Sequence, residues 1–462
     1  MVAASNARSA SPQSLLQRQR WTLDVAQAAV FLNGGVILAL WWADQDMATL
    51  RTAAGQLTAA GRIAGLLGAY LVLLQLLLMA HIPWFDRLLG MGRLAAWHRR
   101  AGFWCLWLLL AHPALLLLGY AASDHRLHLG GLPREGWQLL TAYPDVLMAT
   151  VALALLVAAA GASVRAVQRK LAYETWYFVH LYTYLAVALA FSHQLADGDE
   201  FVTHPLTRIY WSALYLLALG ALLVWRVGLP LARAARHQLR VAGIVDEAPG
   251  VFSIYLTGRR LDQLPALAGQ FFLWRFLTRD RWWQARPFSL SAAPNGRWLR
   301  ITVKGQSGDT HSLRQLAPGT RVLAEGPYGA FTDAARSRPK VLLIAGGIGI
   351  TPLRALLEAI PLGVHAVLLY RSKGPEEVVF RTELEQLVRW RGATVRYLHD
   401  ARGRPRDPWR PVGPATINWL VPDVTVRDVY LCGPPGLLDD ARRSLRSLGV
   451  PEAQIHCEQF AF

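Results

Sequence analysis

The sequence predicts a membrane-embedded all-α bundle of six helices, followed by a small β-barrel domain and a doubly wound α/β domain. Hydrophobic residues make up 53% of the 462 residues and charged residues only 17%, whereas a soluble chain carries about 25% charged residues. Long apolar segments fill the first half of the chain, and short strand-like segments fill the second half. We expect a cytoplasmic segment 1–20, a membrane domain 21–230, a barrel 235–335 and an α/β domain 338–462.

Six apolar segments in the first half each contain a stretch near the length of about 20 residues that crosses a bilayer core. They cover residues 25–50, 63–85, 101–123, 146–164, 175–196 and 209–225. Buried helices of a large soluble protein are the alternative, but such helices average about a dozen residues and have a polar face. We therefore expect six transmembrane helices that contact the lipid bilayer.

The charges between these segments predict an orientation. Residues 1–229 hold 16 basic and 11 acidic residues, and residues 230–462 hold 32 and 20, which together give the net charge of +17. Arginines precede the first segment and recur in alternate loops, for example Arg99 and Arg100. By the positive-inside rule, both termini and the whole second half face the cytoplasm, and the first segment is an uncleaved span of a multi-pass plasma-membrane protein.

Two other protein classes are disfavoured. The positive charge alone would suggest nucleic-acid binding, but the chain contains no recognition motif, so we expect no nucleic-acid partner. Cys105, Cys432 and Cys457 form no CxxC pair, which argues against a disulfide scaffold or a zinc site.

Four histidines lie in or directly beside the third and fifth apolar segments, where an ionisable side chain suggests a functional site. His98, just before the third segment, and His112 within it are 14 residues apart, and His180 and His193 are 13 apart on the fifth. At 1.5 Å per residue, each pair spans about 20 Å of a core about 30 Å thick. We expect two haems: an inner one held by His98 and His180 (the inner pair) and an outer one held by His112 and His193 (the outer pair).

The angular spacing suits one helix better than the other. A separation of 14 residues returns to within about 40° of the same helix face, which fits His98 and His112. A separation of 13 residues misses by about 140°, so the fifth segment requires a local irregularity such as a π-bulge, or offset haems. His81 is expected at the cytoplasmic interface.

The second half carries two patterns that indicate dinucleotide binding. Gly346, Gly347, Gly349, Thr351 and Pro352 follow an apolar strand and open a helix, where glycines and helix amides can approach a pyrophosphate. Arg286, Pro287, Phe288 and Ser289 lie on a predicted barrel strand, where an arginine can neutralise a flavin pyrophosphate and an aromatic ring can pack on the flavin. Alone, the first pattern fits a tight turn and the second an ordinary strand.

Taken together, these motifs resemble the family of transmembrane ferric reductases and NADPH oxidases, of which the chain is identified as a bacterial member. The resemblance covers the second to sixth segments and the whole second half. It rests on the four histidines and on the motifs that begin at Arg286, Gly326, Gly346 and Cys432, together with the final five residues. Arg286 stands where NADPH oxidases often have histidine, but soluble ferredoxin reductases also use arginine there.

The resemblance implies FAD, NADPH and two b-type haems as cofactors. The Arg286 motif would bind FAD, with the segment from Lys304 to Thr310 at its phosphates and Gly326 and Tyr328 in a further matching motif. The glycine loop and the segment Cys432, Gly433 and Pro434 would bind the nicotinamide coenzyme. At the chain end, which includes Glu458, Phe462 would stack on the flavin, with Phe460 as the alternative.

Two further positions concern the acceptor and the coenzyme. Leu116 stands where mammalian oxidases carry another histidine, so Arg62 is the charged candidate beside the outer haem, or else a snorkelling interfacial residue. Arg371 and Ser372 follow the second α/β strand, and Arg402 and Arg404 lie in a later loop. Such residues favour the extra phosphate of NADPH, although NADH use stays possible.

The resulting hypothesis is an NAD(P)H-dependent membrane oxidoreductase. Electrons would pass from cytoplasmic NADPH through FAD and the two haems to an extracytoplasmic acceptor, with oxygen giving superoxide as the first choice. One alternative is a ferric-chelate reductase with the same electron-transfer path, and another is a haem subunit that passes electrons to a partner protein. A homo-oligomer stays open.

Overall fold

The computed structural model describes residues 12–43, 45–123, 132–164, 167, 171, 173–197, 204–305, 308–399 and 411–459. Two compact units are present. The first consists of Met1–Phe85 and Gly92–Val227, and the second of Asp86–Met91 and Gly228–Phe462.

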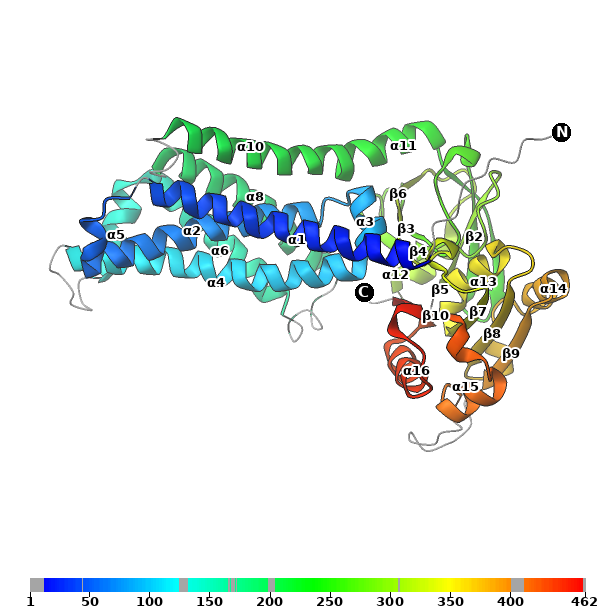
Figure 1. The fold of residues 1–462 in the computed structure, drawn as a ribbon. Coiled ribbons are helices and arrows are strands. Elements are labelled where there is room, and N and C mark those ends of the chain that lie inside the picture. Colours follow the sequence, from blue (N-terminus) through cyan, green and yellow to red (C-terminus); the bar gives the residue numbers. More distant parts are fainter. Residues whose placement is uncertain are drawn as a thin grey trace, which may run out of the picture. The chain divides into compact units, whose positions relative to one another are not determined.

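Helices account for nearly all of the described first unit, and Figure 1 shows the long ones lying along one another. The helices up to the start of the second unit are α1 (Pro12–Ala43), α2 (Ala53–Leu78), α3 (Pro83–Leu89), α4 (Met91–Ser123), α5 (Leu132–Ala142), α6 (Pro144–Ala162), α8 (Tyr173–Asp197) and α10 (Pro205–Ala221).

Five helices of the described residues are long and apolar enough to cross a membrane, which supports a multi-pass membrane protein. They are Trp21–Ala43, Ala53–Leu78, Gly92–Ser123, Asp145–Ala162 and Pro205–His237. The expected count of six is not reached, because α8 does not meet the same standard. The helix is long enough, but its tyrosines and both of its histidines keep every membrane-length stretch of it below the hydropathy that the other five helices reach.

The packing of the first unit agrees with an apolar environment around it. Ile37 of α1, Leu73 of α2 and Trp211 of α10 share a buried cluster. In contrast, Phe103, Trp104 and Trp107 of α4 are each more than half exposed. Large aromatic side chains that face outward suit a helix surrounded by lipid.

The π-bulge considered for the fifth segment is not found there, because α8 runs as one α-helix from Tyr173 to Asp197. A π-helix occurs instead at Leu222–Gly228, between α10 and α11 (Leu229–His237). His180 and His193 therefore keep the angular offset of about 140° that a separation of 13 residues gives on a regular helix. Of the two explanations considered for this spacing, a π-bulge or offset haems, only the offset haems remain.

The prediction of a closed β-barrel is wrong, because the antiparallel strands form two separate sheets. The strands β1 (Arg240–Ala248), β2 (Val251–Thr257) and β5 (Leu299–Lys304) form one sheet, and β3 (Phe271–Phe276), β4 (Arg286–Ser289) and β6 (Val322–Tyr328) form another. In the described residues only the isolated bridges Arg240–Arg321 and Leu290–Ile301 link these sheets. Strand β4 has four residues and contains Pro287, which lacks an amide donor, so the ladder cannot extend around a closed barrel.

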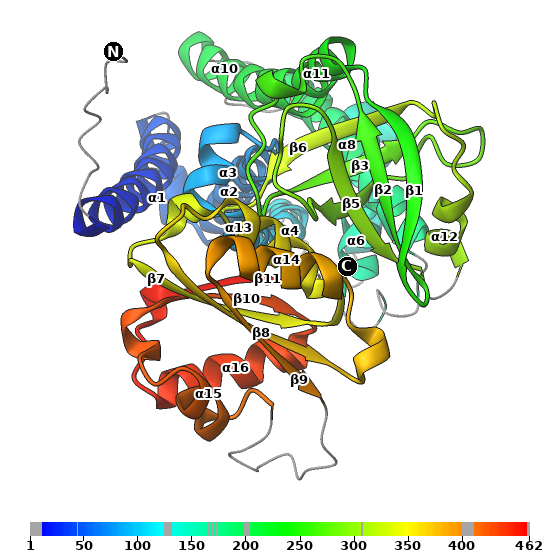
Figure 2. The same cartoon turned by 90° about the vertical axis from the view of Figure 1, so that its right-hand side faces the viewer.

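The rest of the second unit is the predicted doubly wound α/β domain. Its parallel sheet has the order β11-β10-β7-β8-β9, and Figure 2 shows helices on both faces. The bounds are β7 (Lys340–Gly346), α13 (Ile350–Ala359), β8 (His365–Ser372), α14 (Arg381–Arg391), β9 (Thr394–His399), α15 (Pro414–Leu420), β10 (Asp428–Gly433), α16 (Pro435–Ser447) and β11 (Ile455–Gln459).

Alternate residues of the central strand β7 explain this layering. Val341 and Leu343 belong to the buried cluster shared with α13 and α14. Leu342 and Ile344 belong to the cluster shared with α15 and α16. Both faces of a parallel strand are thus apolar and covered.

Candidate functional site

The inner pair of histidines joins two helices of the first unit, with the two rings close together and steeply inclined to each other. The ring centroids of His98 on α4 and His180 on α8 are 6.0 Å apart, with an angle of 69° between the planes. A metal–imidazole bond is about 2 Å long and a ring centroid lies about 1 Å beyond its nitrogen, so imidazoles on opposite sides of one metal have centroids about 6 Å apart. The inner pair therefore has the separation that one shared metal would require.

Polar atoms of the inner pair also lack protein partners. The Nδ1 atoms of His98 and His180 are buried and make no hydrogen bond with any described residue. Buried polar atoms are nearly always paired in folded proteins. Trp176 stacks on His180 with a centroid distance of 5.4 Å and fixes one face of that ring. The buried, unpaired nitrogens are thus consistent with a polar or metal-containing group bound between the two rings.

The outer pair has a defined ring orientation at His112. Its Nδ1 lies 2.8 Å from the carbonyl oxygen of Gly61 on α2. A carbonyl oxygen can only accept, so Nδ1 carries the proton and Nε2 keeps its lone pair. His193 of α8 is close enough to interact electrostatically with His112. The unprotonated Nε2 is the form of imidazole that binds metals.

The two other residues considered for the outer site lie on different helices, Arg62 on α2 and Leu116 on α4. Arg62 follows Gly61 directly and is half-buried. Leu116, one turn beyond His112, is the nearest residue to the position that a side chain on Gly61 would occupy.

Three residues line up across the second sheet of the antiparallel region. Phe271 of β3 pairs with Ser289 of β4 on one side and with Tyr328 of β6 on the other. Ser289 is buried, and its Oγ has no hydrogen-bond partner in the part of the chain that the structure describes. The Tyr328 hydroxyl donates to Glu325 at 3.0 Å. The predicted flavin residues Ser289 and Tyr328 are therefore brought together, and Phe271 lies between them.

The remaining predicted flavin residues lie around this row. Arg286 and Phe288 pair with Trp274 and Phe272 on β3, and Pro287 lies between them. Lys304 ends β5 and forms a weak ion pair with Glu377 at 3.8 Å. Thr310 lies in the short helix α12 (Gly308–His311).

The glycine loop and the Cys432 segment are in direct contact at the carboxyl ends of β7 and β10. A Cβ on Gly349 would lie 2.3 Å from the Cys432 carbonyl oxygen, and one on Gly433 would lie 3.2 Å from Gly346. Gly347 has a φ of 54° and an open side. The glycine loop and the Cys432 segment therefore leave no room for a side chain between them. At Gly347, in contrast, the glycine loop has open space beside it that a ligand could enter.

The first turn of α13 and the start of α16 complete this edge of the sheet. The Thr351 hydroxyl donates to the Ile348 carbonyl at 3.0 Å. Both Thr351 and Pro352 are buried. Pro434 precedes α16, and its Cδ is 3.1 Å from a Cβ placed on Gly346.

Glu458 is a carboxyl group in a region of little water. It pairs in register with Cys432 across β10 and β11, and one of its oxygens lies 3.9 Å from a Cβ placed on Gly329. Burial raises the pKa of Glu458 to about 7. Burial also raises the pKa of the Cys432 thiol, with Glu458 and Cys457 adding to the effect. Near neutral pH, Glu458 can therefore hold or release a proton beside the predicted coenzyme segment.

The structure describes two of the residues that are expected to favour NADPH over NADH, Arg371 and Ser372. The Ser372 hydroxyl is buried, donates to the Gly374 carbonyl at 3.0 Å and lies 3.0 Å from His399 Nδ1. Arg371 precedes it and pairs in register with Gly346 of the glycine loop. Arg402, Arg404, Phe460 and Phe462 lie outside the described residues. Of Arg371 and Ser372, only Arg371 carries a positive charge, and its backbone lies beside the glycine loop.

Some site residues could not be found from the sequence. Phe271 belongs to an ordinary apolar strand, and only the strand pairing puts it beside Ser289 and Tyr328. Gly61 acts through its backbone carbonyl, which leaves no signature in the side chain. The spacing of Gly61, Gly65 and Gly68 was the available signal, because close helix packing in membranes uses small residues at such intervals.

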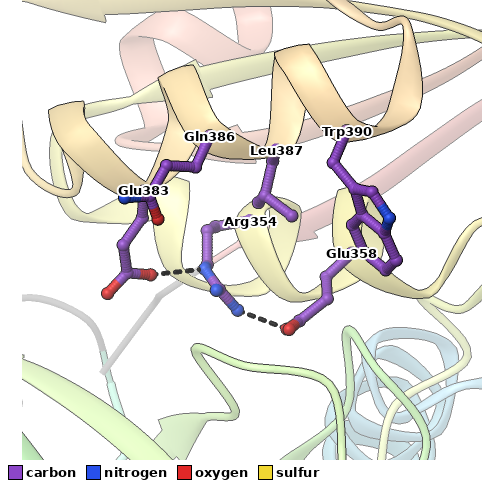
Figure 3. A pocket seen from close by; sticks show the side chains of 6 residues that line it. All are labelled: Arg354, Glu358, Glu383, Gln386, Leu387 and Trp390. Atoms are coloured by element: carbon purple, nitrogen blue, oxygen red, sulfur yellow. Dashed lines mark hydrogen bonds and ion pairs between the residues drawn. The ribbon is translucent and has the colours of Figure 1, made fainter.

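A separate pocket of about 310 Å³ lies between α13 and α14. It is lined by Arg354, Glu358, Glu383, Gln386, Leu387 and Trp390. Figure 3 shows Arg354 between the two glutamates, with an ion pair to each. None of these residues was among the predicted site residues, and the one arginine of this pocket is already paired with both of its glutamates.

Two segments of the chain match known families. Residues 64–191 match the family described as "Ferric reductase like transmembrane component". Residues 343–443 match the family described as "Oxidoreductase NAD-binding domain". The first match contains His98, His112 and His180 and ends two residues before His193, and the second contains both the glycine loop and the Cys432 segment.

Curated relatives and solved structures match the second half. Ferredoxin–NADP reductase B of Sorangium cellulosum is 32% identical over 193 residues, covering 38% of this chain and 78% of that protein. A flavohemoprotein of Vibrio cholerae serotype O1 is 33% identical over 189 residues, covering 38% of this chain and 46% of that protein. The crystal structure of the flavohem-like FAD/NAD binding domain of nitric oxide dioxygenase from Vibrio cholerae O1 biovar El Tor is 26% identical, with a TM-score of 0.41, covering 49% of this chain and 99% of that one.

The chain spans about half the length of the flavohemoproteins that it matches, 46% and 51% for two of them. The ferredoxin–NADP reductase, in contrast, is covered over most of its length. The relatives are oxidoreductases, as expected for the second half. The chain therefore belongs to the family that its motifs indicated: it joins a ferric-reductase-like transmembrane component to an oxidoreductase domain of the ferredoxin–NADP reductase type.

Proposed function

We propose that this protein transfers electrons from NADPH through FAD and two b-type haems to an acceptor on the other side of the membrane. The observation that carries the proposal is the inner pair, whose rings are 6.0 Å apart on two helices of the first unit. A ligand pair for one iron in the membrane unit, joined to a reductase domain of the FAD/NAD type, is the arrangement that transmembrane electron transfer needs.

The haem ligands would be His98 and His180 at the inner site, and His112 and His193 at the outer site. When bound, FAD accepts a hydride and gives up single electrons, and the haem irons relay single electrons. Two imidazoles for each haem would leave no open position for the acceptor on either iron, so the haems would only pass electrons on. The protein would then contribute the spacing of the two sites, their insulation from water and the basicity of each imidazole.

The dinucleotides would lie at two places in the second unit. Ser289, Tyr328 and the Arg286 motif would hold FAD, and the orphaned Ser289 Oγ supports this placement. The glycine loop and the Cys432 segment would hold NADPH, with Arg371 at its extra phosphate. Phe462, or Phe460, would cover the flavin until the nicotinamide displaces it, and Glu458 would hold a proton nearby.

We further propose six spans, with α8 as the sixth, and both termini in the bacterial cytoplasm. Placing two ligands on α8 requires it to run through the membrane beside α4, and the contact between His98 and His180 supports this. NADPH would then be used on the cytoplasmic side, and the acceptor would be reduced outside.

Oxygen is the proposed acceptor, with two superoxide ions formed for each NADPH consumed. Ferric-chelate reduction is the second candidate, because the membrane segment matches a ferric-reductase-like family. The two are separated by giving reduced membranes oxygen or a ferric chelate in turn. Superoxide dismutase should abolish cytochrome c reduction if oxygen is the acceptor, and should leave iron reduction unchanged if the chelate is reduced directly.

The proposed electron path is tested by measuring the number of haems per chain in membranes that contain the full chain. The wild type should hold two haems per chain, both reduced anaerobically by NADPH. His98→Ala and His180→Ala should each lose the same one, which halves the haem absorbance while FAD binding persists. His81→Asn is the matched control, since His81 has a φ of 57° that asparagine tolerates. Wild-type membranes without haem absorption would overturn the proposal.

A further inference from the structure

Helix α2 contacts α4 through a repeating set of polar bonds. The Gly61 carbonyl accepts from His112 Nδ1 at 2.8 Å, the Gly68 carbonyl accepts from Cys105 Sγ at 3.6 Å, and Gln75 Nε2 donates to the His98 carbonyl at 2.9 Å. On both helices the three contacts are seven residues apart. A seven-residue repeat keeps one face of each antiparallel helix towards the other along its whole length, so α2 fixes the register of the helix that carries one histidine from each pair.

Glycines on α2 make this approach possible. A Cβ on Gly65 would lie 2.5 Å from His112 Nδ1 and 2.8 Å from its Cε1. A Cβ on Gly61 would lie 3.0 Å from Leu116, and one on Gly68 would lie 2.7 Å from a terminal carbon of Leu109. Of these three positions, only Gly65 would place its side chain against a histidine ring.

Helix α2 makes a different kind of contact with each of the two histidines of α4. At His112, the backbone of α2 accepts the Nδ1 proton directly. At His98, α2 reaches only the backbone carbonyl, and Nδ1 of the ring has no partner among the described residues. A hydrogen bond from Nδ1–H to a carbonyl fixes the tautomer of a ligating imidazole and makes its other nitrogen a stronger donor.

We propose that Gly61 and Gly65 are positioning residues for His112, and that they tune the outer haem site separately from the inner one. The Gly61 carbonyl holds the Nδ1 proton, and the missing side chain of Gly65 leaves the room that the ring occupies. This assignment rests on the proposed function. A stronger imidazole donor favours ferric over ferrous iron, so weakening this bond raises the midpoint potential of one haem and leaves the other unchanged.

Three glycine-to-alanine variants of the full chain test this assignment. Gly65→Ala displaces the His112 ring, and Gly61→Ala strains α4 against α2 without touching the ring. Gly68→Ala is the matched control, because it crowds Leu109 on the same interface rather than a histidine. The readouts are a spectroscopic redox titration of membranes and the low-temperature EPR spectrum of the oxidised haems.

The expected order of effects is Gly65→Ala first, then Gly61→Ala, with Gly68→Ala like the wild type. The shift should appear in one of the two titration steps and one EPR signal, or as loss of that haem alone. If the Gly65→Ala protein does not accumulate in membranes, the redox titration and EPR spectrum of Gly61→Ala are compared with those of Gly68→Ala instead.

Two different outcomes separate the positioning role from the proposed function. Wild-type membranes with two haems, together with equal behaviour of Gly65→Ala, Gly61→Ala and Gly68→Ala, would overturn only the positioning role. Wild-type membranes without haem would overturn both.

Discussion

At the scale of the residue, Glu458 shows how burial changes what a side chain can do. Burial raises its pKa from 4.5 to about 7, so the folded protein keeps a proton that the unfolded chain releases at lower pH. Between these two values the native state binds more protons, and the free energy of unfolding therefore falls as the pH rises. Each pKa unit corresponds to about 1.4 kcal/mol, which gives a total of about 3 kcal/mol.

Glu458→Gln should remove this dependence. Relative to the wild type, we expect the variant to gain stability steadily from about pH 4.5 to about pH 7, with no further change above that range. Thermal unfolding of the purified full chain in detergent, repeated across this pH range, measures the effect. Parallel curves for the two proteins would show that Glu458 does not titrate in this way.

The sequence revealed individual residues only where their chemistry is unusual for their surroundings. Histidines stand out in an apolar segment, and glycines stand out between a strand and a helix, so both groups could be named in advance. Gly61 could not, because its role depends on which carbonyl the fold brings to His112. Ser372 shows the opposite problem: a hydroxyl suited to a phosphate in sequence is already bonded to Gly374 in the structure.

At the scale of the element, a buried arginine ties the antiparallel sheets to the α/β domain. Arg300 of β5 donates to Glu383 of α14 at 2.6 and 2.9 Å, and Arg354 of α13 forms an ion pair with the same carboxylate at 2.8 Å. Glu358 extends the chain of charges by accepting from the Ala293 amide at 2.7 Å. Burial would raise the pKa of Glu383, but Arg300 and Arg354 outweigh it and hold that pKa below its usual value.

Glu383→Gln should therefore destabilise the second unit by about 2 kcal/mol near neutral pH, because it leaves Arg300 buried without its charge partner. A carboxyl group with a depressed pKa loses its contribution as the pH falls through that value, so the gap to the wild type should close in acid. Denaturant unfolding followed by flavin fluorescence measures both. Glu385→Gln removes the same charge from an exposed position on α14 and should change little.

Elements could be predicted where periodicity and turn signals agree. Alternating segments predict strands over Val251–Thr257 and Leu299–Lys304, and β2 and β5 have these bounds. The sequence pattern predicts a helix near Glu376–Arg389, but α14 begins only at Arg381, because Phe380 adopts a φ of 62° and separates it from a short 3-10 turn. Closure of a barrel and the location of a π-helix depend on strand length and helix packing, which periodicity does not contain.

At the scale of the whole molecule, the position of α8 decides the topology. Its histidines are needed for both proposed haem sites, yet the same histidines reduce its apolar character below that of the other long helices. A helix can cross a membrane with such residues when they face a bundle interior. The number of spans is therefore the largest-scale feature that hydropathy alone left open.

Fusions of alkaline phosphatase test the topology, because this reporter becomes active only outside the cytoplasm. With six spans, fusions after Met47 and His204 should be active, and those after Leu171 and the chain end inactive. If α8 does not cross, the fusion after His204 should be inactive and the one at the chain end active. Immunoblots of each fusion control for its abundance.

The pairing of β10 with β11 has a chemical consequence for a protein that handles electrons. Cys457 is in register with Leu431, one residue before Cys432, so the two thiols project from opposite faces of the sheet. Cys432 belongs to the cluster under α13 and α14, whereas Cys457 packs against the other cluster. The two sulfurs cannot join in a disulfide, and the raised pKa of each keeps it in the unreactive thiol form. The pleat of one sheet thus keeps two neighbouring thiols from forming a disulfide in a domain that is proposed to carry electrons.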